Sequence, residues 1–330
     1  MVNGKNFMQF KLKKISGDAS FREFYRVQKR STSTILVKAN KDKFKNLITY
    51  AAINKLLIDN KIKTPKLVKE YFNHGMMEIE DLGFFSFIEH IKSKKNKFED
   101  YKKLIDIIIK LQNIKLKKFI KIKHHKINFV RYTLSELQKE SDLFFDWYLK
   151  NNCKKSKFKK NKSKIKKELI SLYKRLHYQN RCFVHRDFHA SNIMIKKKSF
   201  GLIDSQDLLI GNLLYDPMSL IDDVRIKLPL GLKYKLFDYY LLKTKKVDKK
   251  EKTLAKNDFD ILSIQRNLRI LGIFVRLCKR DNKSNYLKFL PYTWELLQLR
   301  LKNPIFKNLC ALLNKAVPLK KRTKVNFYAD

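Results

Sequence analysis

The sequence predicts an α+β protein in which a small antiparallel β region is followed by a larger, mainly helical region. Residues 10–37, 66–72 and 76–80 alternate between apolar and polar residues, as strands do. From residue 84 onward, apolar residues mostly recur at three- and four-residue spacing, which indicates amphipathic helices. The 330 residues are also enough for two regions that each bury a core.

The boundary between these regions is predicted after residue 82, which gives a nucleotide-binding part at 1–82 and a helical catalytic and acceptor-binding part at 83–330. The first part is expected to contain one amphipathic helix, at 43–60. In the second part, a short hairpin of 193–195 with 200–203 is expected among helices. These helices are predicted at 84–92, 98–113, 129–149, 163–179, 218–224, 231–242, 256–279, 284–301 and 303–315.

The net charge of the chain is +44, from 75 Lys and Arg against 31 Asp and Glu. The lysines occur in nearly every segment and greatly outnumber the arginines, whereas nucleic-acid sites favour clustered arginine. The charge therefore indicates a compositional bias, and we expect no specific nucleic-acid partner. The densest run of lysine, at 154–167, is typical of a solvated helix face or a flexible insertion.

The four cysteines are Cys153, Cys182, Cys278 and Cys310, and no Cys-x-x-Cys pair occurs. This spacing argues against structural zinc and against a disulfide scaffold. No window approaches eighteen uncharged apolar residues, and the N-terminal segment has no apolar core. We expect a cytoplasmic protein without a membrane partner; the sequence gives no indication of its oligomeric state.

The segment VHRDFHASN at 184–192, followed by Ile203-Asp204, is typical of a phosphotransferase. Phosphoryl transfer to a hydroxyl needs a carboxylate that orients the hydroxyl and takes its proton. Asp187 is predicted to be this base. Magnesium needs hard oxygen ligands, so Asn192 and Asp204 are predicted to hold Mg²⁺ with ATP.

Three segments of the first region indicate a nucleotide site. The turn at 16–21 is rich in small residues, which let backbone amides approach phosphates. Lys38 ends a strand and is expected to neutralise the α- and β-phosphates. The segment 77–83 is predicted to be a hinge between the two regions, and its backbone could bind the edge of the adenine ring. The predicted nucleotide-binding residues are Ser16, Gly17, Ser20, Lys38, Glu80 and Leu82.

Other residues are predicted near the acceptor or in support of the site. Gln206 and Asp207 follow Asp204 directly and are expected near the acceptor. Trp147 could stack on a sugar ring or pack in a core. Asp216 is expected to cap a helix, to hold the catalytic loop through its backbone amides, or both, and His185 is grouped with it as a supporting residue.

The distance along the chain from Asp204 to Tyr215 is only eleven residues. A protein kinase needs a longer segment there to dock a peptide, so a small-molecule kinase is expected. Six segments then resemble, in order and spacing, the anomeric N-acetylmuramate/N-acetylglucosamine kinases of the aminoglycoside-phosphotransferase-like group. They are SGDASFREFYRV, MMEIEDLG, ESDLFFDWYL, VHRDFHASNIMI, GLIDSQDLLIGNLLYDPMSL and ILSIQRNLRILGIFVRLCKRDNKSNYLKFLP.

This resemblance spans roughly residues 15–295. It implies a two-lobed protein-kinase-like fold and ATP-dependent phosphorylation of the C1 hydroxyl of an amino sugar in cell-wall recycling. The chain departs from the family at 37–40, where the family has an acidic residue and prolines. The role of Lys38 therefore comes from kinases in general, and Tyr50 stands near the position of the usual glutamate partner.

Two alternatives remain open. The first is a kinase of another small hydroxyl acceptor. An aminoglycoside is disfavoured because polycations need an acidic cleft, and a choline-like acceptor would need an aromatic cage. The second is a kinase-shaped binding protein without catalysis, which the complete set of Asp187, Asn192 and Asp204 disfavours.

Overall fold

The computed structural model describes residues 11–15, 22–29, 32–40, 44–197 and 199–322. Its contacts divide the chain into two compact units. The first comprises Met1–Ser93, Lys117–Phe129 and Ser191–Leu208, and the second comprises Lys94–Leu116, Val130–Ala190 and Leu209–Asp330. The first unit thus extends past the boundary predicted at residue 82, to Ser93, and includes two further segments from beyond it. Within the described ranges, no helix is both long and apolar enough to cross a membrane.

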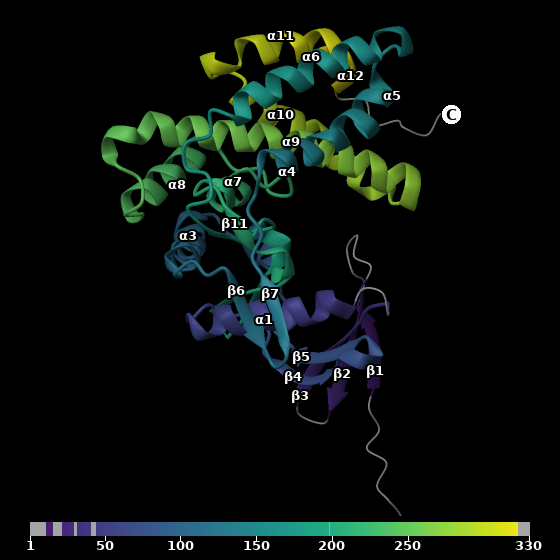
Figure 1. Ribbon diagram of the computed structural model, residues 1–330, viewed down its shortest axis with the longest axis vertical. Helices are drawn as coiled ribbons and strands as arrows, with labels where there is room; N and C mark the ends of the chain where they lie inside the picture. Colours follow the sequence, from purple (N-terminus) through teal and green to yellow (C-terminus); the bar gives the residue numbers. More distant parts are fainter. Residues whose placement is uncertain (1–10, 16–21, 30–31, 41–43, 198, 323–330) are drawn as a thin grey trace, which may run out of the picture. The chain divides into compact units, whose positions relative to one another are not determined.

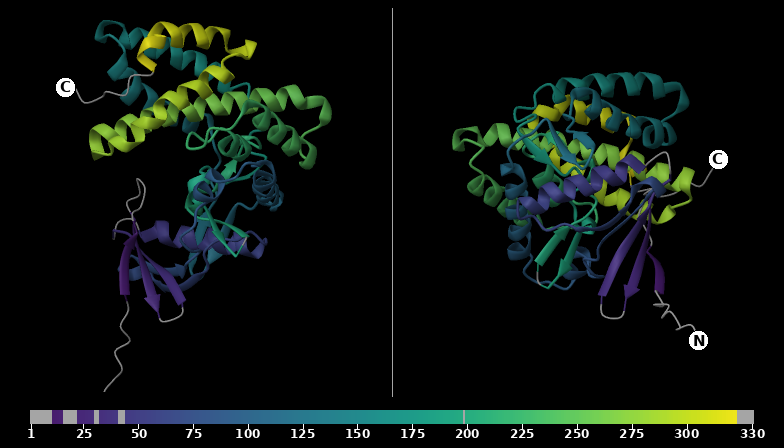
Figure 2. Two further views of the ribbon diagram at one scale, coloured as in Figure 1. Left: turned by 180° about the vertical axis from the view of Figure 1, so that it is seen from behind. Right: turned by 60° about the horizontal axis from the view of Figure 1, so that its bottom comes forward.

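An antiparallel sheet of five strands, in the order β1-β2-β3-β5-β4, forms the first unit and confirms the predicted β region. Figure 2 shows β1, β2 and β3 side by side. The strands are β1 (Lys11–Ile15), β2 (Glu23–Lys29), β3 (Thr32–Lys38), β4 (Leu67–Tyr71) and β5 (Met76–Glu80).

The core of this unit lies between the sheet and helix α1 (Phe44–Asp59), which confirms the helix predicted at 43–60. Alternation in β3 turns Ile35 and Val37 to the core, and α1 adds Leu47 and Ile48 to it. Burial of such side chains contributes roughly 1.5–3 kcal/mol each. The packing of α1 against this cluster is what fixes the helix on the sheet.

A tight turn at η2 (Phe72–His74) joins β4 to β5. Gly75 follows it with φ of +66°, and its carbonyl accepts a hydrogen bond of 2.8 Å from the Ala39 amide. A Cβ at Gly75 would lie 2.5 Å from the carbonyl oxygen of Ala39. Glycine is therefore required here by both the left-handed backbone and the close approach.

The remaining elements of the first unit come from three stretches of chain. Helix α2 begins with a capping box of Ser86 and Glu89, and β9 with β10 is the predicted hairpin. The hairpin of β6 and β7 was not predicted; its Ile122 and Ile127 pack against the core. These elements are α2 (Phe87–Lys92), β6 (Phe119–Ile122), β7 (His125–Asn128), β9 (Ile193–Lys196), β10 (Ser199–Leu202) and η5 (Ser205–Asp207).

The second unit is mainly helical, as predicted, with one short pair of antiparallel strands, β8 and β11. Its 30-residue helix α9 packs against α4 and α10 (Figure 1). The elements are α3 (Phe98–Asn113), α4 (Leu134–Leu143), η3 (Phe144–Leu149), α5 (Lys150–Asn152), α6 (Lys155–Tyr173), β8 (Cys182–Val184), η4 (Ala190–Asn192, at the junction of the two units), β11 (Leu209–Gly211), α7 (Tyr215–Ile221), α8 (Leu230–Lys243), η6 (Lys249–Glu251), α9 (Lys252–Asp281), η7 (Ser284–Phe289), α10 (Leu290–Arg300), η8 (Pro304–Phe306), α11 (Lys307–Ala316) and α12 (Leu319–Arg322).

The lysine-rich run at 154–167 lies in α6 and is a solvated helix face, the first of the two predicted possibilities. Ile165, Leu169 and Leu172 form the buried side of this helix, while most of its lysines are exposed. The helix predicted at 129–149 starts later, at Leu134, and its last six residues are the π-helical η3.

Gly272 in the middle of α9 explains a close crossing of this helix with the end of α4. A Cβ on Gly272 would lie 2.2 Å from the carbonyl oxygen of Leu143 and 2.6 Å from the amide nitrogen of Phe144. Such distances do not occur between real atoms, so any side chain would push the two backbones apart. The crossing is also where α4 passes into η3, and such π-helical turns change the path of a helix.

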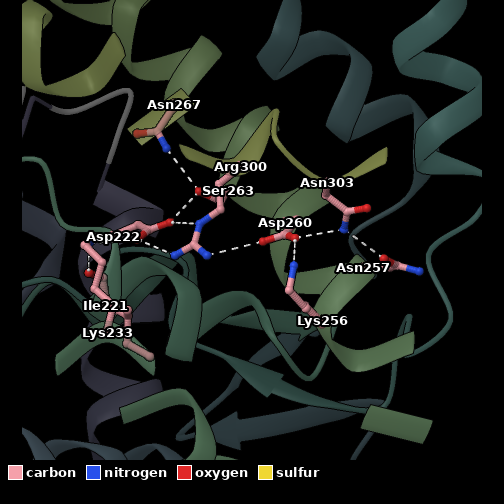
Figure 3. A network of polar contacts seen from close by, with 10 residues as sticks. All are labelled: Ile221, Asp222, Lys233, Lys256, Asn257, Asp260, Ser263, Asn267, Arg300 and Asn303. Atoms are coloured by element: carbon pink, nitrogen blue, oxygen red, sulfur yellow. Dashed lines mark hydrogen bonds and ion pairs between the residues drawn. The ribbon is translucent and has the colours of Figure 1, made fainter. Parts of the chain in front are cut away.

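A buried polar network joins helices α8, α9 and α10 (Figure 3). Its centre is the fully buried Asp222, which receives two hydrogen bonds of 2.9 Å from Arg300, one of 2.9 Å from Lys233 and one of 2.6 Å from Ser263. Burial alone would raise the pKa of Asp222, but Arg300 and Lys233 hold it well below its usual range. Asp222 is therefore an anion, and Arg300 also reaches Asp260 at 3.3 Å.

The crossing at Gly272 gives a direct test of this packing. Replacing Gly272 with Ala should lower the free energy of unfolding by roughly 1–3 kcal/mol, the usual cost of overpacking. The control is Gly231→Ala in α8, where an added Cβ meets nothing within 4 Å; it should be neutral or stabilising by up to about 1 kcal/mol. Urea denaturation of both variants measures the difference, and equal stabilities would contradict the close crossing.

Candidate active site

The first unit contains a cavity of about 360 Å³ at the inner face of its sheet, a size typical of small-molecule sites. One wall is apolar and carries Ile35, Ile79 and Met194. The polar groups lining it come from three places in the chain: the ends of β2 and its preceding turn, the hinge after β5, and the segments before β9 and after β10. They are Arg22, Arg26, Glu80, Asp81, Gly83, Ser191, Asn192 and Asp204.

Asp81 fixes the conformation of the hinge. Its buried carboxylate accepts hydrogen bonds from Arg26 (2.5 and 3.1 Å), from the hydroxyl of Ser33 (2.7 Å) and from the amide of Gly83 (2.8 Å). Burial acts to raise the pKa of Asp81, but the hydrogen bonds from Arg26 and Ser33 outweigh it and lower the pKa. The ionised side chain thus holds the hinge backbone along the cavity wall.

Glu80 and Leu82, the hinge residues predicted to bind adenine, both line the cavity. Lys196 on β9 supports this stretch by donating 3.1 Å to the Glu80 carboxylate and 2.7 Å to the Asp81 carbonyl. The cavity therefore has an apolar wall beside a hydrogen-bonded hinge backbone, a combination that suits a planar heterocycle. Adenine binding by Glu80 and Leu82 stays a prediction.

The two predicted metal ligands are brought together at another side of the same cavity. The backbone carbonyl of Asn192 accepts a hydrogen bond of 3.0 Å from Ile203, and this contact places the residue before Asp204 against Asn192. Both side chains line the cavity. Asp204 has a left-handed backbone, with φ of +65°, and its side chain is 36% exposed.

Asn192 and Asp204 fit a magnesium ion by the chemistry of their donors. One carboxylate and one amide oxygen are the hard ligands that Mg²⁺ accepts, with phosphate and water oxygens completing its shell. In the described part of the chain, no three His, Cys, Asp or Glu side chains are grouped so as to hold a metal. The site therefore suits a magnesium ion shared with a phosphorylated ligand better than a tightly held transition metal.

The remaining predicted nucleotide-binding residues are Ser16, Gly17, Ser20 and Lys38. The first three lie outside the described residues. Lys38 is exposed at the end of β3 and is not among the lining residues. The cation beside Asp204 is instead Arg22, which donates 2.5 Å to its carboxylate and 2.9 Å to the side-chain oxygen of Gln206.

The predicted acceptor residues are found in different surroundings. Gln206 is buried in the first unit and donates 3.0 Å to the exposed Asp207. Trp147 belongs to the second unit, where it is half-buried in η3. No acceptor role follows from these contacts, and all three assignments stay predictions.

The loop that carries Asp187 follows β8 in the second unit. The Asp187 carboxylate is 27% exposed and lies 3.7 Å from the guanidinium of Arg266 on α9. Burial acts to raise the pKa of Asp187, but Arg269 and Arg266 outweigh it and hold the pKa well below its usual range. Asp187 is therefore a carboxylate at any physiological pH, as a base that orients a hydroxyl must be.

Two buried aspartates hold the backbone of this loop. Asp216 on α7 accepts hydrogen bonds from the amides of His185 (2.7 Å) and Arg186 (3.1 Å), the contact predicted as one of its two possible roles. Asp223 accepts 2.9 Å from the amide of Ala190. Burial raises the pKa of Asp216 to about 7, although the two amides oppose this.

His185 and His189 lie on either side of Asp187 in this loop. His185 is fully buried, with its ring 5.9 Å from that of Phe188 in an edge-to-face contact. Burial and the nearby Arg225 lower the pKa of His189 to about 3, so its imidazole is uncharged at neutral pH. The uncharged ring of His189 thus leaves the arginines as the cations beside Asp187.

Glu140, Arg266 and Arg269 are parts of the site that sequence reasoning missed. Glu140 on α4 accepts 2.5 Å from Arg186 and 3.0 Å from Gln265, lies 3.8 Å from Arg269, and accepts a hydrogen bond from the hydroxyl of Tyr132. It lies three residues after Leu137 and four before Phe144, on the apolar face of the helix. An acidic residue on the apolar face of a helix could have indicated a buried ion pair, because a buried charge needs partners.

Comparison with known proteins places these features in a family. A profile of the phosphotransferase enzyme family matches residues 11–249. N-acetylmuramate/N-acetylglucosamine kinases from Pseudomonas aeruginosa and Neisseria meningitidis are 26% and 24% identical over 294 and 298 residues, which cover 86% and 87% of this chain and 81% and 86% of theirs.

Two solved structures share the fold. Aminoglycoside phosphotransferase APH(2'')-Ib superimposes with a TM-score of 0.59 at 15% identity, over 90% of this chain and 94% of that one. A Plasmodium vivax ethanolamine kinase gives 0.61 at 15% identity, over 91% and 84%. The fold is therefore the predicted protein-kinase-like one, and the chain belongs to the phosphotransferase enzyme family.

Proposed function

We propose that this enzyme transfers the γ-phosphoryl group of ATP to the C1 hydroxyl of N-acetylmuramate or N-acetylglucosamine, in the cytoplasm. The relatives that match most of the chain carry this substrate pair in their names, and the segments particular to that branch are present in this sequence. The basic balance of the chain, 75 cations against 31 acids, also suits an acceptor with a carboxylate better than a polycation.

The observation that carries the proposal is the contrast between two carboxylates, Asp187 and Asp204. Asp187 lies beside two arginines that keep it ionised. A base does not need a second oxygen ligand beside it, as a metal site does. Asp204 lies with Asn192 at the wall of a cavity of nucleotide size. A base and a pair of oxygen ligands within one short segment are the parts that phosphoryl transfer to an alcohol requires.

In this proposal the residues act mainly by position. Asn192 and Asp204 hold Mg²⁺, which when bound neutralises charge on the phosphate oxygens. Asp187 accepts a hydrogen bond from the acceptor hydroxyl, orients it, and takes its proton as the new O–P bond forms and the bond from the γ-phosphorus to the β-phosphate oxygen breaks, with ADP as the leaving group. Because the arginines lower its basicity, Asp187 contributes more by orientation than by early proton removal.

The acceptor is tested with a panel of free sugars, aminoglycosides and choline, each with magnesium and ATP. We expect ADP release with N-acetylmuramate and N-acetylglucosamine, together with an acid-labile sugar 1-phosphate. Release only with an aminoglycoside or choline would move the enzyme to another branch of its family. Failure of the whole panel, with no ATP binding, would favour a binding protein without catalysis.

The role of Asp187 is tested by Asp187→Asn, which keeps the size of the side chain and removes its charge. We expect kcat to fall about 10²- to 10⁴-fold with little change in the affinity for ATP, because Asp187 does not line the cavity. Asp238→Asn, which removes an exposed ion pair of 2.8 Å with Lys252 in the same unit, is the matched control. Unchanged turnover in the Asp187 variant would exclude it as the base.

The pairing of Asp187 with Arg266 predicts a pH effect. Arg266→Gln removes a cation that favours the ionised form, so the pKa of Asp187 should rise and activity on the acidic side should be lost at a higher pH than in the wild type. The profile of kcat/KM, measured from about pH 3 to 7 so that it includes the ordinary range of an aspartate, reports this shift. Arg280→Gln, which breaks an exposed pair with Asp281 on the same helix, should leave it unchanged.

A Lys variant at Arg266 separates charge from shape. If Arg266→Lys restores the acidic limb toward that of the wild type, the effect comes from the positive charge beside Asp187. If both variants lose activity equally at every pH, Arg266 acts only by holding the loop, through its hydrogen bond of 3.3 Å to the carbonyl of Arg186.

A further inference from the structure

The cavity of the first unit is lined by two arginines with different surroundings, and the first of them belongs to the hinge. Arg26 donates to both carboxylate oxygens of Asp81 and, at 2.9 Å, to the carbonyl of Gly83. Its guanidinium also lies 3.4 Å from the ring centroid of Phe84. These contacts use the charge and most of the donors of Arg26 to fix the hinge, so it is a structural residue.

Arg22 lies at the side of the cavity that carries Asp204. Its side chain is only 4% exposed, yet it lines the cavity. One terminal nitrogen donates 2.5 Å to the Asp204 carboxylate, and the other donates 2.9 Å to Gln206. The predicted metal ligand and a buried arginine are thus in direct contact, which brings two opposite charges to the place where phosphate and metal would meet.

Two aromatic rings hold the guanidinium of Arg22 from the other sides. The ring centroids of Phe24 and Tyr50 each lie 5.6 Å from its central carbon, a distance at which a cation is attracted to a ring. Tyr50 is buried on α1, and its hydroxyl is beside Asn54 and the backbone of Asp204. The residue at the position of the usual glutamate partner therefore faces Arg22.

Lys38 has none of these features. It is exposed at the end of β3, it pairs in register with Glu23, and it is not among the residues that line the cavity. An exposed lysine that does not line the cavity cannot neutralise a phosphate inside it unless the end of the strand changes conformation. The cavity has its own cation in Arg22, and Arg22 is already oriented.

We infer that Arg22, and not Lys38, binds the polyphosphate of the nucleotide in this enzyme, with Phe24, Tyr50 and Gln206 as its positioning residues. The inference rests on the proposed function in one respect, that ATP is the donor. The planar guanidinium presents paired donors that match phosphate oxygens. Asp204 can give its charge to the metal, while Gln206 and the two rings keep the guanidinium in place for the phosphate.

Binding measurements test this directly. Calorimetry would give the dissociation constants of ATP and ADP with magnesium, and of adenosine, for the wild type, Arg22→Met, Arg22→Lys and Lys38→Met. Arg22→Met should weaken ATP and ADP about 10- to 100-fold, as the loss of charged hydrogen bonds does, and leave adenosine unchanged. Arg22→Lys keeps the positive charge but loses the paired donors of the guanidinium, so its affinity for ATP and ADP should lie between those of Arg22→Met and the wild type. Lys38→Met should bind both nucleotides as the wild type does.

The inference is overturned if Arg22→Met binds ATP as tightly as the wild type, or if Lys38→Met is the variant that weakens ATP. An equal loss of adenosine and ATP in both Arg22 variants would also overturn it, because the arginine would then act through the fold of the cavity. Wild-type protein that binds ATP but phosphorylates no amino sugar would contradict the proposed acceptor only. Wild-type protein that binds no ATP would overturn both.

Discussion

The ionised carboxylate of Asp222 is the interaction on which the second unit depends. It is completely buried, and Arg300, Lys233 and Ser263 supply it with hydrogen bonds from three helices. A buried ion pair adds little net stability, but removing one partner leaves an uncompensated charge at a cost of roughly 3–5 kcal/mol. Asp222 is the centre of the network in Figure 3. The next residue, Asp223, accepts a hydrogen bond from the amide of Ala190 in the loop that carries Asp187, so the network and the loop are joined through two consecutive residues.

The scarcity of acids in this chain makes their distribution informative. Only 31 Asp and Glu residues face 75 Lys and Arg, yet several of the acids are buried at junctions: Asp81 in the hinge, Glu140 under the loop, and Asp216 and Asp223 on its backbone amides. Cations are in excess almost everywhere, so a buried carboxylate readily finds a partner. The lysines, by contrast, lie mostly on solvated faces such as that of α6, where their number constrains neither the core nor the site.

Local patterns allowed the sequence to predict the fold and the segments of the site. The period of apolar residues located α1 and α9, and the spacing of Asp187, Asn192 and Asp204 identified the chemistry. Arg22 was not found in this way, because its place depends on contacts with Asp204 and Gln206, 182 and 184 residues further along the chain. One arginine among so many cations gives no signal of its own. The β6–β7 hairpin and the π-helical η3 were missed for a similar reason, since packing against other elements determines both.

Two residues of the site, Arg186 and Asp204, have left-handed backbones, with φ of +71° and +65°. A side chain in that conformation costs of order 1 kcal/mol that glycine would avoid. Arg186 directly precedes the predicted base, and Asp204 is the predicted ligand of the metal. Glycine at either position would relieve the backbone, but it would also remove the hydrogen bond of Arg186 to Glu140 or the carboxylate of Asp204. Substitutions that stabilise this protein by relieving left-handed backbones should therefore avoid these two residues.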